Sequence, residues 1–342
     1  MIKVGVVGYG VIGQRLADGL ALQEDMELVG VSGNANPTLA IRALKEKGMP
    51  YKLFMASLDK KEIFDQLNIP ISGTLEDLVK ESDVILDATS AGGGMKNKEL
   101  YEKYNKKVIF QGGEKNSVAD VFFHGYANYE KGLGQDYLKL TSCNTTGLIR
   151  AVDCIDKEVG VERVAITIVR RVADPGDYHR GLTNALKVDA APSHQAVDLM
   201  TIMPHIEATG ILVHTPVTHG HIITVLATPK REISKEELLD MFNKHPRIRV
   251  VKIADGFQGN ASLFRYARDL GNPRGDMYEI AVFDETIVKS GKDIMFAINI
   301  PQEAVVIPES IDAIRAATQM QTDKEEALKL TNQYLGMGKW MK

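Results

Sequence analysis

Short apolar runs alternate with segments of helical periodicity along the first 140 residues of the chain. Continuous runs of valine, isoleucine and leucine are typical of strands that are buried on both faces of a parallel sheet. Because strands and helices alternate, the pattern predicts an α/β domain with a Rossmann-type, doubly wound parallel sheet. The expected strands are residues 2–7, 26–31, 84–89, 108–110 and 137–140, and the expected helices are 14–22, 37–48, 74–78 and 97–104, with 59–66 as a polar connection.

The pattern changes after a helical segment at 148–159, because strand-like runs then follow one another with few helical segments between them. Such grouping favours an antiparallel or mixed sheet and therefore a second, α+β domain. Its expected strands are 164–172, 211–216, 222–227, 249–253, 279–286 and 293–298, its expected helices are 193–203 and 234–242, and residues 177–192 form a long irregular connection. Two more helices, 308–320 and 324–334, are expected at the end of the chain.

A glycine-rich turn joins the first expected strand to the first expected helix. Gly8, Gly10 and Gly13 form a G-x-G-x-x-G motif in the order strand, turn, helix, which is typical of dinucleotide-binding sites. The first glycine permits the tight turn, the second lets the backbone approach a pyrophosphate, and the third allows close packing of helix and strand. The sequence therefore predicts a nicotinamide dinucleotide cofactor, with phosphate at the helix N-terminus.

The second expected strand ends without the acidic residue that usually binds the ribose 2′-hydroxyl of NAD. Residues 32–36 read Ser-Gly-Asn-Ala-Asn and contain neither an acid that would repel a 2′-phosphate nor a Lys or Arg that would attract one. We therefore expect either NAD or NADP to be accepted.

The length, charge and cysteine content of the chain limit the classes of protein to which it can belong. The chain has 342 residues, enough for two domains, and its net charge of −4 gives no general attraction to nucleic acid or to anionic membranes. No apolar run approaches a membrane span and the first residues lack a signal-peptide pattern, so we expect a cytoplasmic protein. Its two cysteines, Cys143 and Cys154, form neither a disulfide framework nor a zinc-ligand pattern, and no metal is expected.

Cys143 lies between an expected strand and an expected helix, where Asn144, Thr145 or Thr146 can cap the first helical turn. Unpaired N–H groups and the positive end of the helix dipole favour a thiolate, which is the nucleophilic form of cysteine. The alternative is that Cys143 is a small buried residue, as free cysteines usually are. Cys154, three helical turns further on, is expected in the core of the same helix.

A dinucleotide domain beside such a cysteine predicts cysteine-dependent aldehyde oxidation through a thiohemiacetal and a thioester. This scheme needs a base, and His219 and His221 alternate in one extended stretch, so only one is expected to face the site. Arg170 and Arg171 end a strand and can bind phosphate or form surface salt bridges. We expect a dinucleotide-binding domain at 1–140, a catalytic domain at 141–302, and C-terminal helices at 303–342 that pack back on the first domain.

Six segments in the same order resemble the archaeal-type (class II) phosphorylating glyceraldehyde-3-phosphate dehydrogenases, and they span nearly the whole chain. The cysteine and double-arginine segments are the most specific of them. The segments are residues 8–13 (GYGVIG), 111–115 (QGGEK), 142–147 (SCNTTG), 170–175 (RRVADP), 192–194 (PSH) and 302–309 (QEAVVIPE).

The resemblance implies that glyceraldehyde 3-phosphate, inorganic phosphate and NAD or NADP are converted to 1,3-bisphosphoglycerate, usually by a homotetramer. It makes Cys143 the nucleophile and one histidine of the pair the base, and here His219 is preferred and His221 is the alternative. It assigns the cofactor to Gly8, Gly10, Val11, Ile12, Gly13, Gly112, Arg171 and Gln302, and the substrate to Ser142, Cys143, Asn144, His194 and Gln195.

The chain departs from the family pattern in three places. Residues 32–36 lack the Lys and Thr that often favour NADP, Gln195 stands where a second histidine is common, and residues 177–192 match poorly. Two other readings stay open: another cysteine-dependent enzyme such as an aspartate-semialdehyde dehydrogenase, and a non-catalytic dinucleotide sensor in which Cys143 is structural.

Overall fold

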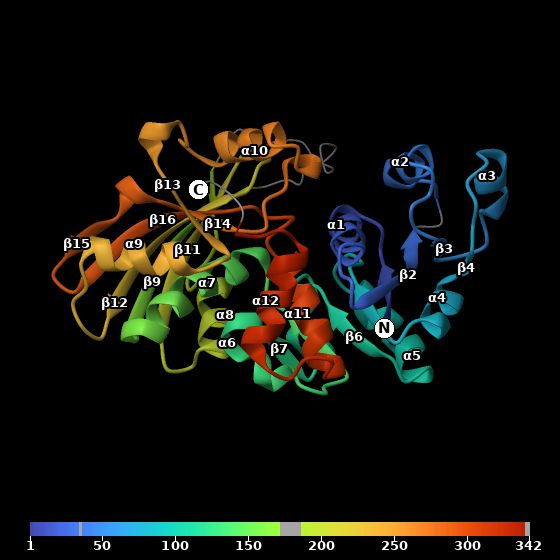
Figure 1. Ribbon diagram of the computed structural model, residues 1–342, viewed down its shortest axis with the longest axis horizontal. Helices are drawn as coiled ribbons and strands as arrows, with labels where there is room; N and C mark the ends of the chain where they lie inside the picture. The colour runs from blue at the N-terminus through green and yellow to red at the C-terminus, as the bar shows by residue number, and fades with distance from the viewer. Residues whose placement is uncertain (34–35, 172–185, 339–342) are drawn as a thin grey trace. The chain divides into compact units, whose positions relative to one another are not determined.

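The computed structural model describes residues 1–33, 36–171 and 186–338 (Figure 1). Three parts of the expectations above lie outside the described residues: Asn34 and Ala35 after the second strand, residues 172–175 of the double-arginine segment, and most of the connection 177–192.

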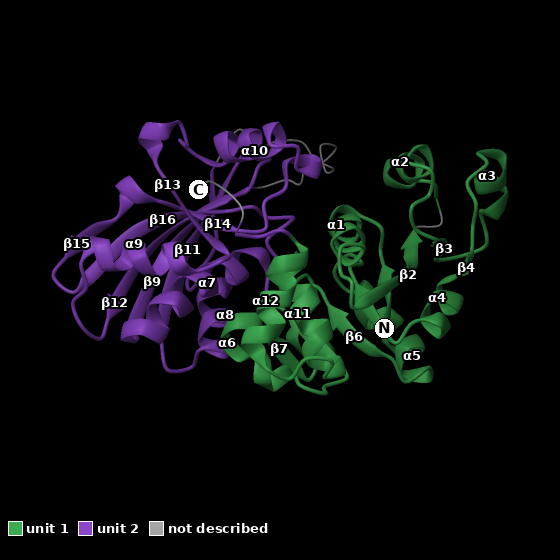
Figure 2. Cartoon of the chain, in the orientation of Figure 1, with its two compact units in different colours: residues 1–140, 307–335 green, residues 141–306, 336–342 purple. Residues whose placement is uncertain are grey.

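The chain divides into two compact units, which are coloured separately in Figure 2. The first unit combines Met1–Leu140 with Ile307–Leu335, so that the chain returns to it near its end. The second unit comprises Thr141–Val306 and the residues from Gly336 onward.

The first unit contains a parallel sheet of eight strands in the order β4-β3-β2-β1-β5-β6-β8-β7. Because β1 lies between β2 and β5, the chain winds outward from it in both directions, which confirms the doubly wound Rossmann-type prediction. The strands are β1 (Ile2–Val7), β2 (Met26–Gly33), β3 (Leu53–Met55), β4 (Gly73–Thr74), β5 (Val84–Asp87), β6 (Lys107–Phe110), β7 (Val121–Phe123) and β8 (Tyr137–Leu140).

Helices of the first unit bury apolar faces against this sheet, and the two C-terminal helices belong to the same core. Helix α11 packs on β6 and β8 and against α12. Its Arg315 is fully buried and donates hydrogen bonds to the Asp25 carboxylate at 2.8 Å and to Thr331 at 2.7 Å. The helices are α1 (Val11–Leu20), α2 (Leu39–Glu46), α3 (Lys61–Gln66), α4 (Leu75–Glu81), α5 (Gly93–Lys103), α6 (Gly125–Asn128), α11 (Ile307–Thr318) and α12 (Lys324–Tyr334).

The second unit contains a mixed sheet in the order β10-β11-β9-β12-β16-β14-β13, with β15 paired to β16, as the grouped strands predict. Strands β9 and β11 are parallel, whereas β12 is antiparallel to both β9 and β16. The strands are β9 (Val161–Arg171), β10 (Lys187–Val188), β11 (Glu207–Thr215), β12 (His221–Pro229), β13 (Ile248–Val251), β14 (Ile280–Phe283), β15 (Val288–Ser290) and β16 (Asp293–Ile300).

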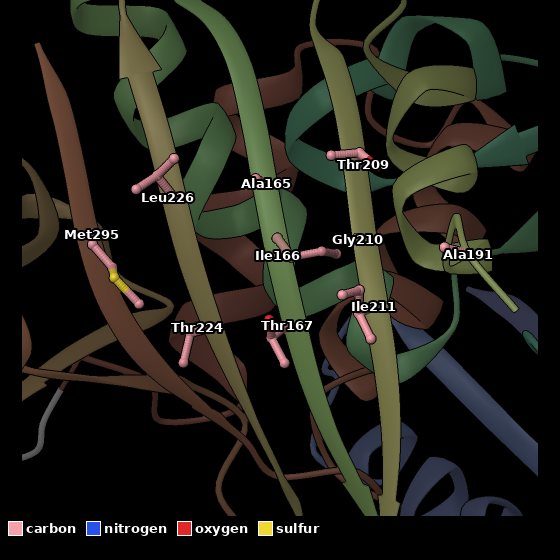
Figure 3. Close-up of a pocket in the computed structure, with 10 residues that line it drawn as sticks. All are labelled: Ala165, Ile166, Thr167, Ala191, Thr209, Gly210, Ile211, Thr224, Leu226 and Met295. Atoms are coloured by element: carbon pink, nitrogen blue, oxygen red, sulfur yellow. The ribbon is translucent and has the colours of Figure 1, made fainter. Parts of the chain in front are cut away.

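The two faces of the mixed sheet differ. Helices α7 (Cys143–Val159), α8 (His194–Ile202) and α9 (Lys235–Lys244) pack on one face, and α10 (Asn260–Asp269) belongs to a separate small core with Phe257 and Phe283. On the other face, side chains of β11, β9, β12 and β16 line a shallow hollow of about 440 Å³ (Figure 3). Ile211 and Met295 in this hollow are 48% and 41% exposed, which leaves an apolar surface in contact with solvent.

The elements absent from the sequence prediction are the shortest or the most polar ones. Strands β3, β4, β7 and β10 have two or three residues each, which is too few to show periodicity. Helix α3 lies where a polar connection was expected and buries only Phe64, and α10 buries only Leu263 and Ala267. Helix α5 begins at Gly93, earlier than expected, because Gly92 adopts a positive φ of 83° and starts the helix.

Candidate active site

Cys143 is the first residue of helix α7, and only Thr141 and Ser142 separate it from the end of strand β8. Ser142 is the N-cap, and its hydroxyl accepts a hydrogen bond from the Thr145 N–H at 3.4 Å. The prediction that Asn144, Thr145 or Thr146 caps the helix is therefore wrong by two to four residues, because the helix begins before the apolar periodicity does. The Cys143 side chain is half-buried and its sulfur is free of any disulfide.

Two packing features set the position of α7. Gly147 lies so close to β16 that a Cβ there would be 2.2 Å from Ile300 Cδ1, so only glycine allows this approach. Arg150, which is fully buried, donates from its two terminal nitrogens to the carbonyl oxygens of Tyr278 and Val305, each at 2.6 Å. The second turn of the helix is thus held by the sheet at Gly147 and by main-chain carbonyls at Arg150.

The structure brings His221, and not His219, to the cysteine. The Nε2 atom of His221 lies 3.7 Å from Cys143 Sγ, and the imidazole is only 1% exposed. His219 is exposed, with its ring 4.7 Å from that of Phe264 and its Nδ1 2.9 Å from the Thr218 hydroxyl. The preference for His219 is thereby reversed, while the expectation that alternate residues face opposite ways agrees with this geometry.

Arg171, at the end of β9, is buried beside the histidine. Its main-chain N–H donates to His221 Nδ1 at 3.2 Å. Its Nη1 donates to the Thr218 carbonyl and to Glu303 Oε1, each at 2.7 Å. Arg171 therefore does not form a surface salt bridge; it links the end of β9 to the turn before β12 and to the segment after β16.

Arg170 points to the other side of β9. Strand alternation places it on the face of Ile166 and Ile168, which are buried beneath the helices, and it is itself half-buried. Its positive charge, together with that of Arg171, acts on the cysteine and on the histidine. A cationic side chain on this face suits an anionic substrate.

Burial controls the protonation of both reacting side chains. It raises the pKa of the Cys143 thiol to about 11, against the opposing charges of Arg170 and Arg171 and a backbone hydrogen bond from Asn144. Burial, and then the charges of Arg171 and Arg170, lower the pKa of His221 well below its ordinary value. In the cofactor-free chain, desolvation therefore outweighs the contributions of the helix N-terminus and the arginines that favour a thiolate.

The predicted substrate residues lie on α7 and on the neighbouring α8. Asn144 is buried, and its Oδ1 accepts no hydrogen bond from the described residues. The Thr145 hydroxyl donates to Asp198 at 3.2 Å, which ties the first turn of α7 to α8. At the start of α8, the His194 Nε2 and Gln195 Nε2 atoms are 2.7 Å apart. Ser142, Cys143, Asn144, His194 and Gln195 all lie in the second unit, and His194 is exposed.

The predicted cofactor turn lies in the first unit, and its geometry fits a dinucleotide. Gly8 has a positive φ of 93°, and a Cβ on Gly13 would be 1.8 Å from the Gly8 carbonyl oxygen. A Cβ on Gly10 would meet nothing within 4 Å, which leaves room for a pyrophosphate, and no side chain caps α1. The N–H groups at the start of α1, where Val11 and Ile12 lie, can therefore bind phosphate oxygens.

Neighbouring loops of the first unit are organised by two acids that the sequence analysis did not single out, of which Asp87 is buried and Glu114 is half-buried. Asp87, at the end of β5, accepts hydrogen bonds from the Thr89 N–H at 2.9 Å and the Tyr101 hydroxyl at 2.6 Å. Glu114, beside Gly112, accepts the Gly94 N–H at 2.9 Å. Both acids shape the glycine loops at the carboxyl edge of the sheet, which is where cofactors bind in this class of fold.

A cation reaches the end of β2 from a distant part of the chain. Lys60, in the loop between β3 and α3, places its ammonium 2.7 Å from Asn36 Oδ1. The local sequence 32–36 lacks a basic residue, so this charge could not be found by inspecting that segment alone.

Among the described residues, no three His, Cys, Asp or Glu side chains form a group that could hold a metal ion. Nor does any described helix combine the length and apolarity needed to cross a membrane.

Two family models of known proteins match separate parts of the chain. Residues 142–269 match the family model "Glyceraldehyde 3-phosphate dehydrogenase, C-terminal domain", and residues 2–113 match "Dihydrodipicolinate reductase, N-terminus". Glyceraldehyde-3-phosphate dehydrogenases of Methanoregula boonei and Thermococcus sibiricus are 40% and 43% identical to the chain, over 98% of its length and 97% and 99% of theirs. Aspartate semialdehyde dehydrogenase II from Vibrio cholerae has a similar fold, with a TM-score of 0.61 over 93% of this chain and 97% of its own, at 13% identity.

We predict that alkylation of Cys143 by iodoacetamide in cofactor-free protein accelerates about tenfold per pH unit between pH 7 and pH 9. Below a thiol pKa of about 11, the thiolate fraction rises in this proportion as protons are removed. The rate is measured by mass spectrometry of the intact chain, with Cys143→Ser as the control for Cys154. A rate that is already independent of pH across this range would show a pre-ionised thiol instead.

Proposed function

The chain belongs to the glyceraldehyde-3-phosphate dehydrogenase family, and we propose which of its residues carry out the family's reaction. It is an NAD(P)-dependent aldehyde oxidoreductase that converts glyceraldehyde 3-phosphate and inorganic phosphate to 1,3-bisphosphoglycerate. The observation that supports the residue roles best is the 3.7 Å contact between Cys143 Sγ and His221 Nε2 at the start of α7.

Cys143 is the proposed nucleophile. Its thiolate attacks the aldehyde carbon and forms a thiohemiacetal, and loss of hydride from that carbon leaves a thioester, which inorganic phosphate cleaves. The bound nicotinamide ring supplies the hydride acceptor. His221 replaces His219 as the proposed histidine of the reaction, because its ring alone of the two lies against the sulfur.

Ser142, Asn144, His194 and Gln195 form the proposed substrate site around Cys143. Asn144 supports this assignment because its buried Oδ1 is available to a substrate hydroxyl. The link from Thr145 to Asp198 brings the start of α8, with His194 and Gln195, next to the start of α7. Arg170, on the same face of the sheet, is a proposed partner for a substrate phosphate.

The proposed cofactor residues come from both units. Gly8, Gly10, Val11, Ile12 and Gly13 would hold the pyrophosphate, and Gly112 lies at the end of a neighbouring strand. Arg171 and Gln302 are proposed from the second unit, which we take as the catalytic domain, with the first as the dinucleotide-binding domain. The ion pair between Arg171 and Glu303, the neighbour of Gln302, supports a common location for these two residues.

An aspartate-semialdehyde dehydrogenase shares the fold, but at 13% identity the likeness concerns the fold alone. A non-catalytic sensor would need no nucleophile, whereas here a cysteine, a histidine and two arginines converge at a helix N-terminus. We therefore retain the dehydrogenase and use the cysteine to test it against both alternatives.

We further propose a cytoplasmic homotetramer that binds neither nucleic acid nor membranes. The net charge of −4 supports the last point. The apolar hollow on the open face of the mixed sheet supports self-association, because exposed apolar patches on soluble proteins commonly mark interfaces (Figure 3).

Purified, reduced protein should reduce NAD or NADP with glyceraldehyde 3-phosphate only when inorganic phosphate or arsenate is present. Absorbance at the nicotinamide band measures the rate with each cofactor. Cys143→Ser should lose turnover by about four or more orders of magnitude, because a covalent nucleophile is removed, and should still bind cofactor. Turnover that persists in this variant, or in the absence of phosphate and arsenate, contradicts the proposed reaction.

Lys60 should favour NADPH, since its ammonium stands at the end of β2, where a ribose 2′-phosphate would lie. Lys60→Met is expected to weaken NADPH binding by up to about fivefold, the size of an exposed ion pair, and to leave NADH binding unchanged. Lys61→Met is the matched control, because Lys61 instead pairs with Asp65 at 2.8 Å. Fluorescence titration measures both cofactors, and equal effects of the two variants would exclude Lys60 from the 2′-phosphate site.

The face of the mixed sheet that carries the hollow lined by β11, β9, β12 and β16 should be buried against another copy of the chain. Light scattering on the eluting protein should therefore give the mass of a tetramer, and Ile211→Asp should reduce it to dimers or monomers. Leu39→Asp is the control, because Leu39 is 83% exposed but lies in the first unit. A monomeric wild-type protein would contradict the proposal, as would a tetramer that is unaffected by the Ile211 substitution.

A further inference from the structure

The carboxylate of Asp87, the last residue of β5, is buried and accepts hydrogen bonds on both of its oxygens. Its Oδ1 accepts the main-chain N–H of Thr89 at 2.9 Å and also the Thr89 hydroxyl. Its Oδ2 accepts the Tyr101 hydroxyl at 2.6 Å and the Asn97 amide at 3.3 Å, both from helix α5. Each oxygen thus has two donors, which offset the cost of placing a carboxylate where water is excluded.

The loop at residues 88–94 is held at both of its ends by acids. Two of the donors to Asp87 come from the first residues of the loop, and the other two come from the helix that the loop leads into. At its far end, the Gly94 N–H donates to Glu114 at 2.9 Å. Between these ends, the Gly93 N–H donates to the Ser90 carbonyl at 2.8 Å, and residues 90–92 are exposed. The backbone of the loop is therefore fixed while its tip faces solvent.

The start of this loop packs against the glycine turn that is proposed to hold the pyrophosphate. A Cβ on Gly8 would be 2.8 Å from the Ala88 carbonyl carbon and oxygen and 2.9 Å from the Thr89 nitrogen, so the two backbones are in direct contact. The Thr89 nitrogen is also the atom whose N–H donates to Asp87. A shift of the carboxylate would therefore reach the turn through a single peptide group.

The segment after β6 adjoins the same loop. The Gln111 N–H donates to the Asp87 carbonyl oxygen at 3.1 Å. A Cβ on Gly113 would be 4.0 Å from the Ala91 Cβ, which is an ordinary van der Waals distance. Residues 88–94 therefore lie beside both glycine segments of the proposed cofactor site, because β5 lies between β1 and β6 and all three strands end at the same edge of the sheet.

We infer that the Asp87 carboxylate fixes the loop 88–94 as one wall of the dinucleotide site and is thereby a positioning residue for NAD or NADP. The inference rests on the proposed function for the place of the cofactor. Asp87 acts through the loop backbone, because it is buried and its oxygens are occupied by four donors. It acts on both cofactors alike, because β1 separates β5 from the end of β2, where a 2′-phosphate would lie.

Tyr101 allows this role to be separated from a direct contact with the cofactor. The residue is fully buried, and burial and then the charge of Asp87 raise the pKa of its phenol well above the ordinary value, so the hydroxyl keeps the proton that it donates. Tyr129 is a matched control, because it is a fully buried tyrosine of the same unit whose hydroxyl donates to the Gln321 carbonyl at 2.7 Å.

Fluorescence titrations with NADH and with NADPH test the inference. Asp87→Asn replaces an acceptor oxygen with an amide N–H₂ that faces other donors, so both dissociation constants should rise by roughly tenfold or more. Tyr101→Phe removes one hydrogen bond of the four and should raise both constants by about two- to fivefold. The controls Tyr129→Phe and Asp25→Asn, the latter at an acid that pairs with buried Arg315, should leave both constants unchanged.

Kinetics and thermal unfolding distinguish positioning from a general loss of structure. Asp87→Asn and Tyr101→Phe should raise the KM for NAD and NADP, with little change in the KM for glyceraldehyde 3-phosphate or in kcat at saturating cofactor. If Asp87→Asn does not fold, the comparison of Tyr101→Phe with Tyr129→Phe decides. Unchanged cofactor affinity in Tyr101→Phe, or an equal loss in Tyr129→Phe, would overturn the inference.

The titrations need no turnover, so failure of the inference and failure of the proposed function give different results. Wild-type protein that binds both dinucleotides without turnover would contradict the proposed reaction, and the variants would still decide the role of Asp87. Wild-type protein that binds neither dinucleotide would contradict the proposed cofactor site and the inference with it.

Discussion

Burial of a thiol against an imidazole is the constraint on which the rest of the site depends. Burial disfavours the charged form of both groups, and the two nearby arginines oppose this effect for the thiol but add to it for the imidazole. The contact between Cys143 and His221 therefore joins two neutral groups in the resting chain. The hydrogen bonds that the backbone offers, more than side-chain ionisation, decide how these groups are oriented.

That contact requires the ends of three elements to meet. Helix α7 must begin at Cys143, β9 must end at Arg171, and β12 must begin at His221. Gly147 permits the first by letting α7 approach β16, and the turn at Gly220 permits the third. Arg150 and Arg171 then bind the same short segment, through the Val305 carbonyl and the Glu303 carboxylate. The segment that leads from the second unit towards α11 is thus tied twice to the elements that carry the site.

Much of this arrangement could be predicted from local sequence. The apolar runs identified the central strands of both sheets, because buried strands leave a pattern that needs no knowledge of their neighbours. The position of Cys143 at the start of a helix followed from the same pattern. Alternation also showed that only one histidine of the pair faces the site. It could not show which one, because the phase depends on how the turn at Gly220 meets β16, and that is a property of the folded sheet.

Other features are tertiary and leave no local signal. Lys60 approaches Asn36 only because β3 lies beside β2, and since the two residues are 24 positions apart in the sequence, inspection of either segment alone does not reveal the pair. The direction of the shift in the Cys143 pKa likewise depends on tertiary structure and could not be predicted from local sequence. A helix N-terminus lowers a thiol pKa wherever it occurs, whereas the cost of burial depends on everything that covers the sulfur. Here burial prevails in the cofactor-free chain.

A site that is neutral at rest has a consequence for catalysis. Donors that are already oriented cost nothing to reorganise when negative charge appears, and in a water-poor site their effect on that charge is large. The main-chain N–H of Arg171 contributes to this order, because it donates to His221 Nδ1 and so helps to fix the ring whose Nε2 lies beside the sulfur.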